Sequence, residues 1–152
     1  MRGLTHRFWK LVGESGIWKV IGRLHAAIYR LSGGRVGHGM AGLTNLLLTT
    51  TGARSGQPRT VPLTYLADGE NYVLVASNGG ADRHPAWWLN LVKTPAATIQ
   101  VGGTTLAVVA SKATPEERAR LWPKLKAVNP FYAMYEELTE REIPVVVLRR
   151  GR

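Results

Sequence analysis

The sequence contains no cysteine, and this absence excludes several kinds of chemistry. Without thiols, the chain cannot use a cysteine nucleophile, bind a metal through thiolates or form disulfides, and it suits a reducing compartment such as the cytoplasm. Histidines are few and lack the spacing of metal ligands: His6, His25, His38 and His84. The sequence therefore predicts neither a metal site nor thiol catalysis.

Long apolar runs are also missing from the chain. No stretch approaches the ~18 apolar residues that indicate a membrane-spanning helix. The N-terminus lacks the uninterrupted apolar region of a secretory signal, because charges recur at Lys10, Glu14 and Lys19. The 152 residues have the length of one domain. We therefore expect a single-domain protein that works in the cytoplasm.

Acidic residues are scarce relative to basic ones. The chain has 10 acidic residues against 20 lysines and arginines, which gives a net charge of +10. This excess favours anionic partners, namely nucleic acid, anionic lipid, or a phosphorylated or polycarboxylated small molecule. Residues 1–41 hold seven of the basic residues and one glutamate, so they contribute +6. We do not expect nucleic acid as a partner, because no aromatic-basic strand motif of the RNA-binding kind occurs.

Residues 1–41 predict a basic helical arm that ends in a glycine-rich link. A helix is expected from Ser15, as its N-cap, to the Gly33-Gly34 pair. Its apolar residues recur at helical spacing: Ile17, Val20, Ile21, Leu24, Ile28 and Leu31. With its flanking cations, this stripe can lie on the anionic inner face of the plasma membrane, pack on the core domain or pack on the second subunit of a homodimer. Packing on protein is the interpretation that we favour.

Residues 45–65 are expected to form two strands joined by a short turn. Gly52 and Gly56 permit a tight reversal between the strands. The turn carries backbone N–H groups, hydroxyls and Arg54, with Arg59 just beyond, and almost no acceptors. This composition suits an anionic group such as a phosphate, although an ordinary hairpin with solvated arginines would have the same sequence. It is not a Walker loop, because no Lys-Ser or Lys-Thr pair follows Gly56.

The predicted core domain, residues 42–152, continues with further strands, two-residue turns and short helices. A second glycine-rich turn lies at residues 77–80. Thr114 begins a helix with a capping box, and a later short helix places Tyr132 and Tyr135 on one face. About six strands with helices inserted late indicate an α+β domain, a small and mostly antiparallel β-barrel.

Four runs of the chain together resemble the deazaflavin-dependent nitroreductase family: TTTGARSGQPRTVPLTYL, VASNGGADRHPAWWLNL, TPEERARLWPKL and NPFYAMYEELTEREIPVVVL. The resemblance covers roughly residues 44 to 149 and leaves out the N-terminal arm. It implies a split β-barrel of the FMN-binding split-barrel type, with flanking helices. The implied cofactor is coenzyme F420, an 8-hydroxy-5-deazaflavin.

The resemblance also implies a role for each matched residue. Those expected to hold the phosphate and the start of the acidic tail of F420 are Gly52, Arg54, Ser55, Gly56 and Gln57. Those expected beside the deazaflavin ring or its linker are Arg59, Val61, Pro62, Leu63, Ser77, Asn78, Gly79, Gly80 and Trp88. The residues implied in catalysis are Tyr132, Tyr135 and Ser77.

Two departures from the family pattern concern the acidic tail. Ala53-Arg54 stands where relatives often show Arg-Lys, and Asn78 stands where lysine is common. Because fewer cations then meet the tail, the sequence predicts a lower affinity for it.

The leading hypothesis is an F420-dependent oxidoreductase that transfers hydride from the reduced deazaflavin to a quinone, a nitroaromatic compound or an activated alkene. The cofactor carries the redox chemistry, so the protein has to position the reactants and supply electrostatic help. A tyrosine hydroxyl, with an ordinary pKa near ~10, would be a neutral donor at pH 7 and could protonate the acceptor. The alternatives are an FMN- or haem-binding split barrel and a basic membrane-associated accessory protein without catalysis.

Overall fold

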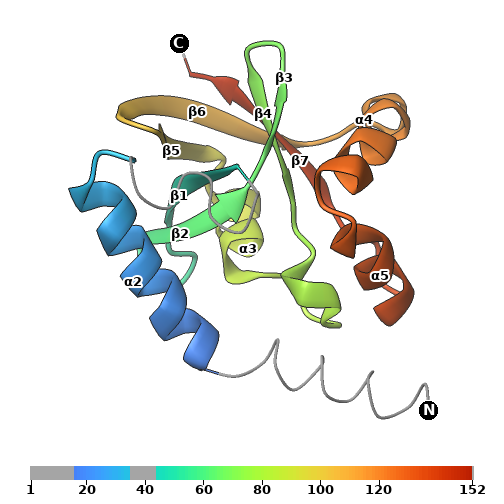
Figure 1. Cartoon of the computed structure of the whole chain (residues 1–152), viewed down its shortest axis with the longest axis horizontal. Coiled ribbons are helices and arrows are strands. Elements are labelled where there is room, and N and C mark those ends of the chain that lie inside the picture. Colours follow the sequence, from blue (N-terminus) through green and yellow to red (C-terminus); the bar gives the residue numbers. More distant parts are fainter. Residues whose placement is uncertain (1–15, 35–43, 152) are drawn as a thin grey trace.

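The fold is organised around one antiparallel sheet of seven strands, seen in a computed structural model that describes residues 16–34 and 44–151 (Figure 1). The strands are β1 (Asn45–Thr51), β2 (Pro58–Thr64), β3 (Leu66–Asp68), β4 (Asn71–Val75), β5 (Ala96–Val101), β6 (Thr104–Lys112) and β7 (Val145–Arg150). Their order in the sheet is β2-β1-β5-β6-β7-β4-β3. The predicted α+β class with a mostly antiparallel barrel is confirmed, as a curled sheet that closes half a barrel.

The sheet has one strand more than the sequence predicts, because the chain changes its partner at Tyr65. Up to Thr64 the chain pairs with β1, with Leu48 opposite Val61. From Leu66 it pairs with β4 instead, with Leu66 opposite Val73. The predicted strand corresponds to β2, and β3 is the additional strand, at the opposite edge of the sheet.

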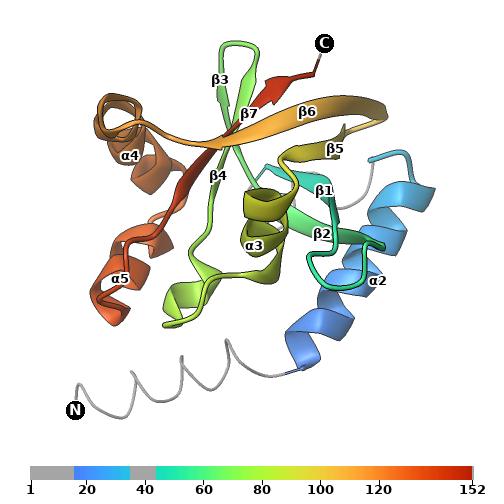
Figure 2. The ribbon, with the colours of Figure 1, turned by 180° about the vertical axis from the view of Figure 1, so that it is seen from behind.

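The helices of the described residues are α2 (Ile17–Leu31), α3 (Ala86–Lys93), α4 (Pro115–Val128) and α5 (Phe131–Leu138), with a short 3-10 helix, η2 (Asn78–Gly80). Figure 2 shows α4 and α5 together near β7, whereas α2 runs along β2 at the other end of the sheet. Across the two described ranges, no helix is long and apolar enough to cross a membrane.

Strand β7 is buried on both faces, which explains its unbroken apolar sequence. Val146 and Leu148 belong to a core that α3 covers with Trp87 and Leu91. On the other face, the buried residues come from β4, β7, α4 and α5: Val73, Val75, Leu121, Trp122, Leu125, Tyr132, Val145 and Val147, with Ile143 preceding β7. The sheet thus separates two cores, and each is closed by different helices.

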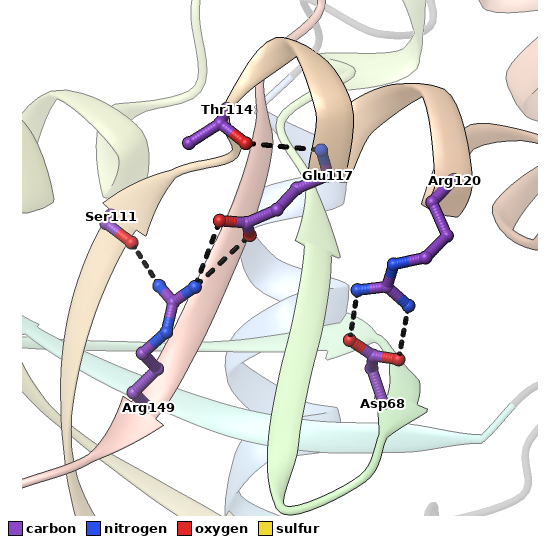
Figure 3. Close-up of polar contacts among 6 residues, drawn as sticks. All are labelled: Asp68, Ser111, Thr114, Glu117, Arg120 and Arg149. Atoms are coloured by element: carbon purple, nitrogen blue, oxygen red, sulfur yellow. Dashed lines mark hydrogen bonds and ion pairs between the residues drawn. The ribbon is translucent and has the colours of Figure 1, made fainter.

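Helix α4 begins with one half of the predicted capping box, the N-cap bond of Thr114, and is fastened by two arginines (Figure 3). The hydroxyl of Thr114 accepts a hydrogen bond of 3.2 Å from the N–H of Glu117. The carboxylate of Glu117 then binds Arg149 of β7 at 3.1 Å. Arg120 forms a two-bond pair with Asp68, at 2.8 and 2.9 Å. Exposed pairs of this kind stabilise weakly, so they orient α4 on the sheet more than they hold the fold.

Helix α2 packs on the sheet with the face opposite its apolar stripe. Tyr29 is fully buried, its hydroxyl accepts from the N–H of Gly102 at 2.7 Å, and it donates to the carbonyl of Asn45 at 3.3 Å. Arg30 donates to the hydroxyl of Thr60 on β2 at 3.0 Å. The ideal Cβ of Gly22 would lie 3.9 Å from Pro62. Contact with the core domain is therefore as expected, but the helix face that makes it is not.

The apolar stripe itself faces away from the sheet. Val20, Leu24 and Leu31 are 65%, 60% and 88% exposed, and Ile21 and Ile28 are also exposed. The reason is that buried polar bonds through Tyr29 fix the rotation of the helix. The stripe therefore has no partner among the described residues.

The predicted limits of the arm are tested only in part. The helix ends at Leu31, and Gly33 and Gly34 follow with φ of 60° and 79°, as the glycine pair predicts. Gly16 occupies the N-cap position, whereas Ser15 and the glycine-rich link across residues 35–43 lie outside the described residues. The division into residues 1–41 and 42–152 stays a prediction.

Candidate functional site

The loop Gly52–Gln57, here called the donor loop, joins β1 to β2 and closes on itself. The N–H of Gly52 donates to the carbonyl of Gln57 at 2.8 Å, and the N–H of Gly56 donates to the carbonyl of Gly52 at 2.9 Å. Both glycines are required: Gly56 has a φ of +66°, and a Cβ at Gly52 would lie 2.7 Å from the hydroxyl oxygen of Ser55. The predicted tight reversal is confirmed.

Two residues of α3 that the sequence analysis missed brace this loop. Asn90 is 7% exposed, and its Oδ1 accepts from the N–H of Ala53 at 2.9 Å. Its Nδ2 donates to the hydroxyl of Thr50 at 3.0 Å. Lys93 donates from Nζ to the carbonyl of Ala53 at 2.6 Å. The only signal in the sequence was a polar side chain on a short apolar helix.

These bonds occupy some of the acceptors of the donor loop. The carbonyl of Gly52 accepts from the N–H of Gly56, that of Ala53 from Nζ of Lys93, and that of Gln57 from the N–H of Gly52. The hydroxyl of Ser55 accepts from the N–H of Gln57 at 3.2 Å and from Arg59 at 3.3 Å.

Two backbone donors of the loop remain unused among the described residues. Within residues 16–34 and 44–151, the N–H groups of Arg54 and Ser55 donate to nothing. In the same residues, none of Arg54, Arg59 and Lys93 forms an ion pair. Free N–H groups and cations with occupied acceptors form an environment for an anion. The donor set of the loop therefore fits a phosphate.

The second turn, residues Ser77–Gly80, is here called the glycine turn. Asn78, Gly79 and Gly80 all have positive φ, at 48°, 63° and 78°. Only asparagine and glycine adopt this conformation at low cost, which explains their presence. A Cβ at Gly80 would lie 3.0 Å from the side chain of Leu138 and 3.2 Å from the Cα of Tyr135. The turn is thus in close contact with α5.

The sequence analysis also missed Arg141, which lies in the segment between α5 and β7. Its guanidinium donates to the carbonyls of Ser77 and Ala81 at 2.8 Å each and to that of Ala76 at 3.3 Å. It also lies 3.3 Å from Nδ1 of His84. Because a guanidinium only donates, Nδ1 is the acceptor and the proton of the neutral ring is on Nε2. No sequence pattern marks this single arginine.

The two tyrosines share a face of α5, as predicted, with ring centroids 6.4 Å apart. Tyr132 is only 6% exposed and stacks on Trp122 at 6.3 Å. Burial raises the pKa of Tyr132 above its ordinary 10.0, and a hydrogen bond with Asn129 opposes this effect. Burial also raises the pKa of Tyr135, which is half-buried. Both hydroxyls are therefore protonated at neutral pH.

Strand β2 and helix α3 bring the expected ring-side residues to one core. Val61, Leu63 and Trp88 are half-buried and pack against the same cluster of buried residues. Pro62 is tolerated because β2 is an edge strand. Helix α3 starts after the glycine turn and ends beside the donor loop, so it connects the two turns. Helix α3 contacts the donor loop through Asn90 and Lys93, whereas the glycine turn contacts α5.

Comparison with known proteins indicates what kind of site this is. The sequence model of the F420H2-dependent quinone reductases matches residues 20–150. The chain belongs to this family. The resemblance to F420-dependent enzymes is therefore confirmed, and the family description specifies a quinone as the acceptor.

Several known proteins match the chain over most of their own length. An F420H2-dependent quinone reductase from Mycobacterium tuberculosis is 47% identical over 132 residues, which cover 84% of this chain and 89% of the relative. A solved F420H2-dependent reductase is 38% identical with a TM-score of 0.64, over 69% of this chain and 93% of that chain. Another solved structure, described as a domain-swapped dimer, is 33% identical with a TM-score of 0.66, over 89% of this chain and 100% of that chain.

Proposed function

We propose that this chain is an F420H2-dependent quinone reductase, which moves a hydride from the reduced cofactor to a quinone. The observation that carries the proposal is the donor loop, in which the N–H groups of Arg54 and Ser55 donate to no group of the described residues. Family membership supports the phosphate of F420 as the anion that this loop would bind. An FMN or haem protein would have less use for the additional cations Arg59 and Lys93.

The cofactor is proposed to lie along α3, between the two turns. Gly52, Arg54, Ser55, Gly56 and Gln57 would hold the phosphate and the start of the acidic tail. Ring and linker would meet the other expected residues: Arg59, Val61, Pro62, Leu63, Ser77, Asn78, Gly79, Gly80 and Trp88. When bound, reduced F420 supplies the hydride. The chain itself contributes binding, orientation and the exclusion of water.

Reduction of a quinone requires a proton as well as a hydride. As negative charge develops on the quinone oxygen, a neutral tyrosine hydroxyl can donate to it, and this bond is stronger in the transition state than in the ground state. Tyr135 is half-buried beside Gly80, whereas Tyr132 lies deeper and stacks on Trp122. We propose Tyr135 and Tyr132 as the donors, with the hydroxyl of Ser77 orienting the acceptor.

The exposed stripe of α2 supports a proposal about where the enzyme works. Its apolar residues are flanked by the exposed cations Lys19, Arg23 and Arg30, and an apolar face with basic flanks suits an anionic lipid surface. We infer peripheral binding to the inner face of the plasma membrane, where lipid-soluble quinones reside. Coverage of the stripe by a second copy, in a homodimer, is the competing outcome.

The first prediction concerns the choice of cofactor. Each charge-assisted hydrogen bond contributes about 1.5–3 kcal/mol. Because FMN has a phosphate but no acidic tail, it should bind at least ~10²-fold more weakly than F420 when two such bonds are lost. Arg54→Ala should raise the Kd for F420 by about tenfold or more, whereas Arg150→Ala, at an exposed position on β7, should not. Titration at one ionic strength measures both effects, and equal Kd values for F420 and FMN would exclude the proposed cofactor.

The second prediction separates the two tyrosines. Tyr132→Phe and Tyr135→Phe each remove a hydroxyl but keep the ring. The variant that has lost the proton donor should turn over roughly 10²-fold more slowly, with its Kd for F420 changed by no more than about twofold. Full turnover by both variants, measured with a soluble quinone, would leave neither tyrosine as the donor.

The third prediction concerns the stripe of α2. The double variant Leu24→Ser, Leu31→Ser should lose sedimentation with anionic liposomes at low salt and keep its affinity for F420. Val109→Ser removes a comparably exposed apolar side chain from β6 and should bind the liposomes as the wild type does. If the wild type stays in the supernatant, membrane binding is wrong. If the wild type is then found to be a dimer and the double variant a monomer, the stripe is the surface that contacts a second copy.

A further inference from the structure

The glycine turn is held at both ends by one side chain that lies far away in the sequence. Arg141 donates to the carbonyls of Ala76 and Ser77, where β4 passes into the turn, and to the carbonyl of Ala81, where the turn ends. A planar guanidinium with five donors can bridge several acceptors at fixed angles, which an ammonium cannot do. Arg141 therefore fixes the distance between the two ends of the turn.

The turn needs such an external tie because little else restrains it. Its three consecutive residues with positive φ, Asn78 to Gly80, occupy a region that most chains avoid. Two backbone hydrogen bonds restrain it. The N–H of Gly80 donates to the carbonyl of Ser77 at 2.9 Å, and the N–H of Ala81 donates to the carbonyl of Asn78 at 3.1 Å. The side chain of Asn78 adds a bond to the carbonyl of Arg83 at 3.0 Å.

The same segment also attaches the turn to α5. The hydroxyl of Thr139, which follows α5, donates to Asp82 at 3.1 Å and accepts from the N–H of Arg141 at 3.3 Å. Gly80 lies so close to Tyr135 and Leu138 that no Cβ fits there without a shift. The glycine turn, the end of α5 and Arg141 thus form one connected unit.

Burial lowers the pKa of Arg141 below its ordinary value, because the cation is partly removed from water. Burying a charge is costly unless hydrogen bonds compensate for it. The carbonyls of the turn supply this compensation only when the turn has the observed shape. A turn of another shape would leave the buried charge of Arg141 without these hydrogen bonds, so other shapes of the turn are disfavoured.

We propose that Arg141 is a positioning residue for hydride transfer. It holds the glycine turn, which meets the cofactor, in a fixed relation to α5, which carries Tyr135. This inference rests on the proposed function. If the glycine turn binds the cofactor and α5 borders the acceptor, the distance between the turn and α5 sets the distance between hydride donor and acceptor. Displacements of about 1 Å can lower rates by ~10²-fold, which makes such a tie consequential.

Arg141→Lys tests the proposal, since lysine keeps the charge but cannot bridge the carbonyls. Arg149→Lys is the matched control, because Arg149 also bridges two partners, Ser111 and Glu117, but far from both turns (Figure 3). Three quantities are measured well below the unfolding temperature of each variant. These are amide hydrogen exchange of residues 76–82 and 131–138, the Kd for F420, and the kcat with a soluble quinone.

For Arg141→Lys we expect at least about tenfold faster exchange in both segments and a kcat lowered by roughly 10- to 10²-fold. The KM for the quinone should change far less than kcat, because the acceptor still reaches its site. Arg149→Lys should lower the unfolding temperature without changing exchange in these segments or kcat.

Two outcomes overturn the proposal. Exchange in residues 76–82 that equals that of the wild type shows that Arg141 does not hold the turn. Faster exchange with an unchanged kcat and Kd shows that Arg141 stabilises the fold without positioning the reactants. A wild type that does not bind F420 is a different result: it contradicts the proposed function, and the exchange data still decide whether Arg141 holds the turn.

Discussion

The rest of the proposed site depends on the two hydrogen bonds of the side-chain amide of Asn90. It binds Thr50 on β1 and Ala53 in the donor loop, so it joins a strand, a loop and a helix. A buried amide that loses a partner is destabilising by about 1–3 kcal/mol, so the three parts hold one another in place. Lys93 adds a hydrogen bond to the carbonyl of Ala53, so α3 holds the loop through two side chains. We propose that the N–H groups of Arg54 and Ser55 in this loop bind the phosphate.

Helix α3 then determines how far apart the two ends of the site lie. It runs from Ala86, after the glycine turn, to Lys93, beside the donor loop. Eight helical residues span about 12 Å, and Trp87 and Leu91 fix the helix in the core. A rigid element of this length between two turns suits a cofactor with a ring at one end and an anion towards the other. In the proposed site, α3 thus sets the distance between the donor loop and the glycine turn, and the two turns supply the groups that bind the cofactor.

Local sequence signals predicted the local structure well. The glycines at 52 and 56, the N-cap at Thr114 and the shared face of the tyrosines follow from neighbouring residues, and all are present. Asn90 and Arg141 could not be predicted, because their partners lie 37 and 64 residues away in the chain. The apolar periodicity of α2 indicated a helix but not its rotation, which depends on the distant contact of Tyr29 with Gly102.

The central claim is that the chain passes a hydride from reduced F420 to a quinone. The most direct test mixes the protein anaerobically with reduced F420 and a soluble quinone, and follows the visible absorbance of the oxidised deazaflavin. The account predicts that oxidised F420 and hydroquinone form in equal amounts, at a rate proportional to the protein concentration. Formation of oxidised F420 no faster than in the mixture without protein would contradict it.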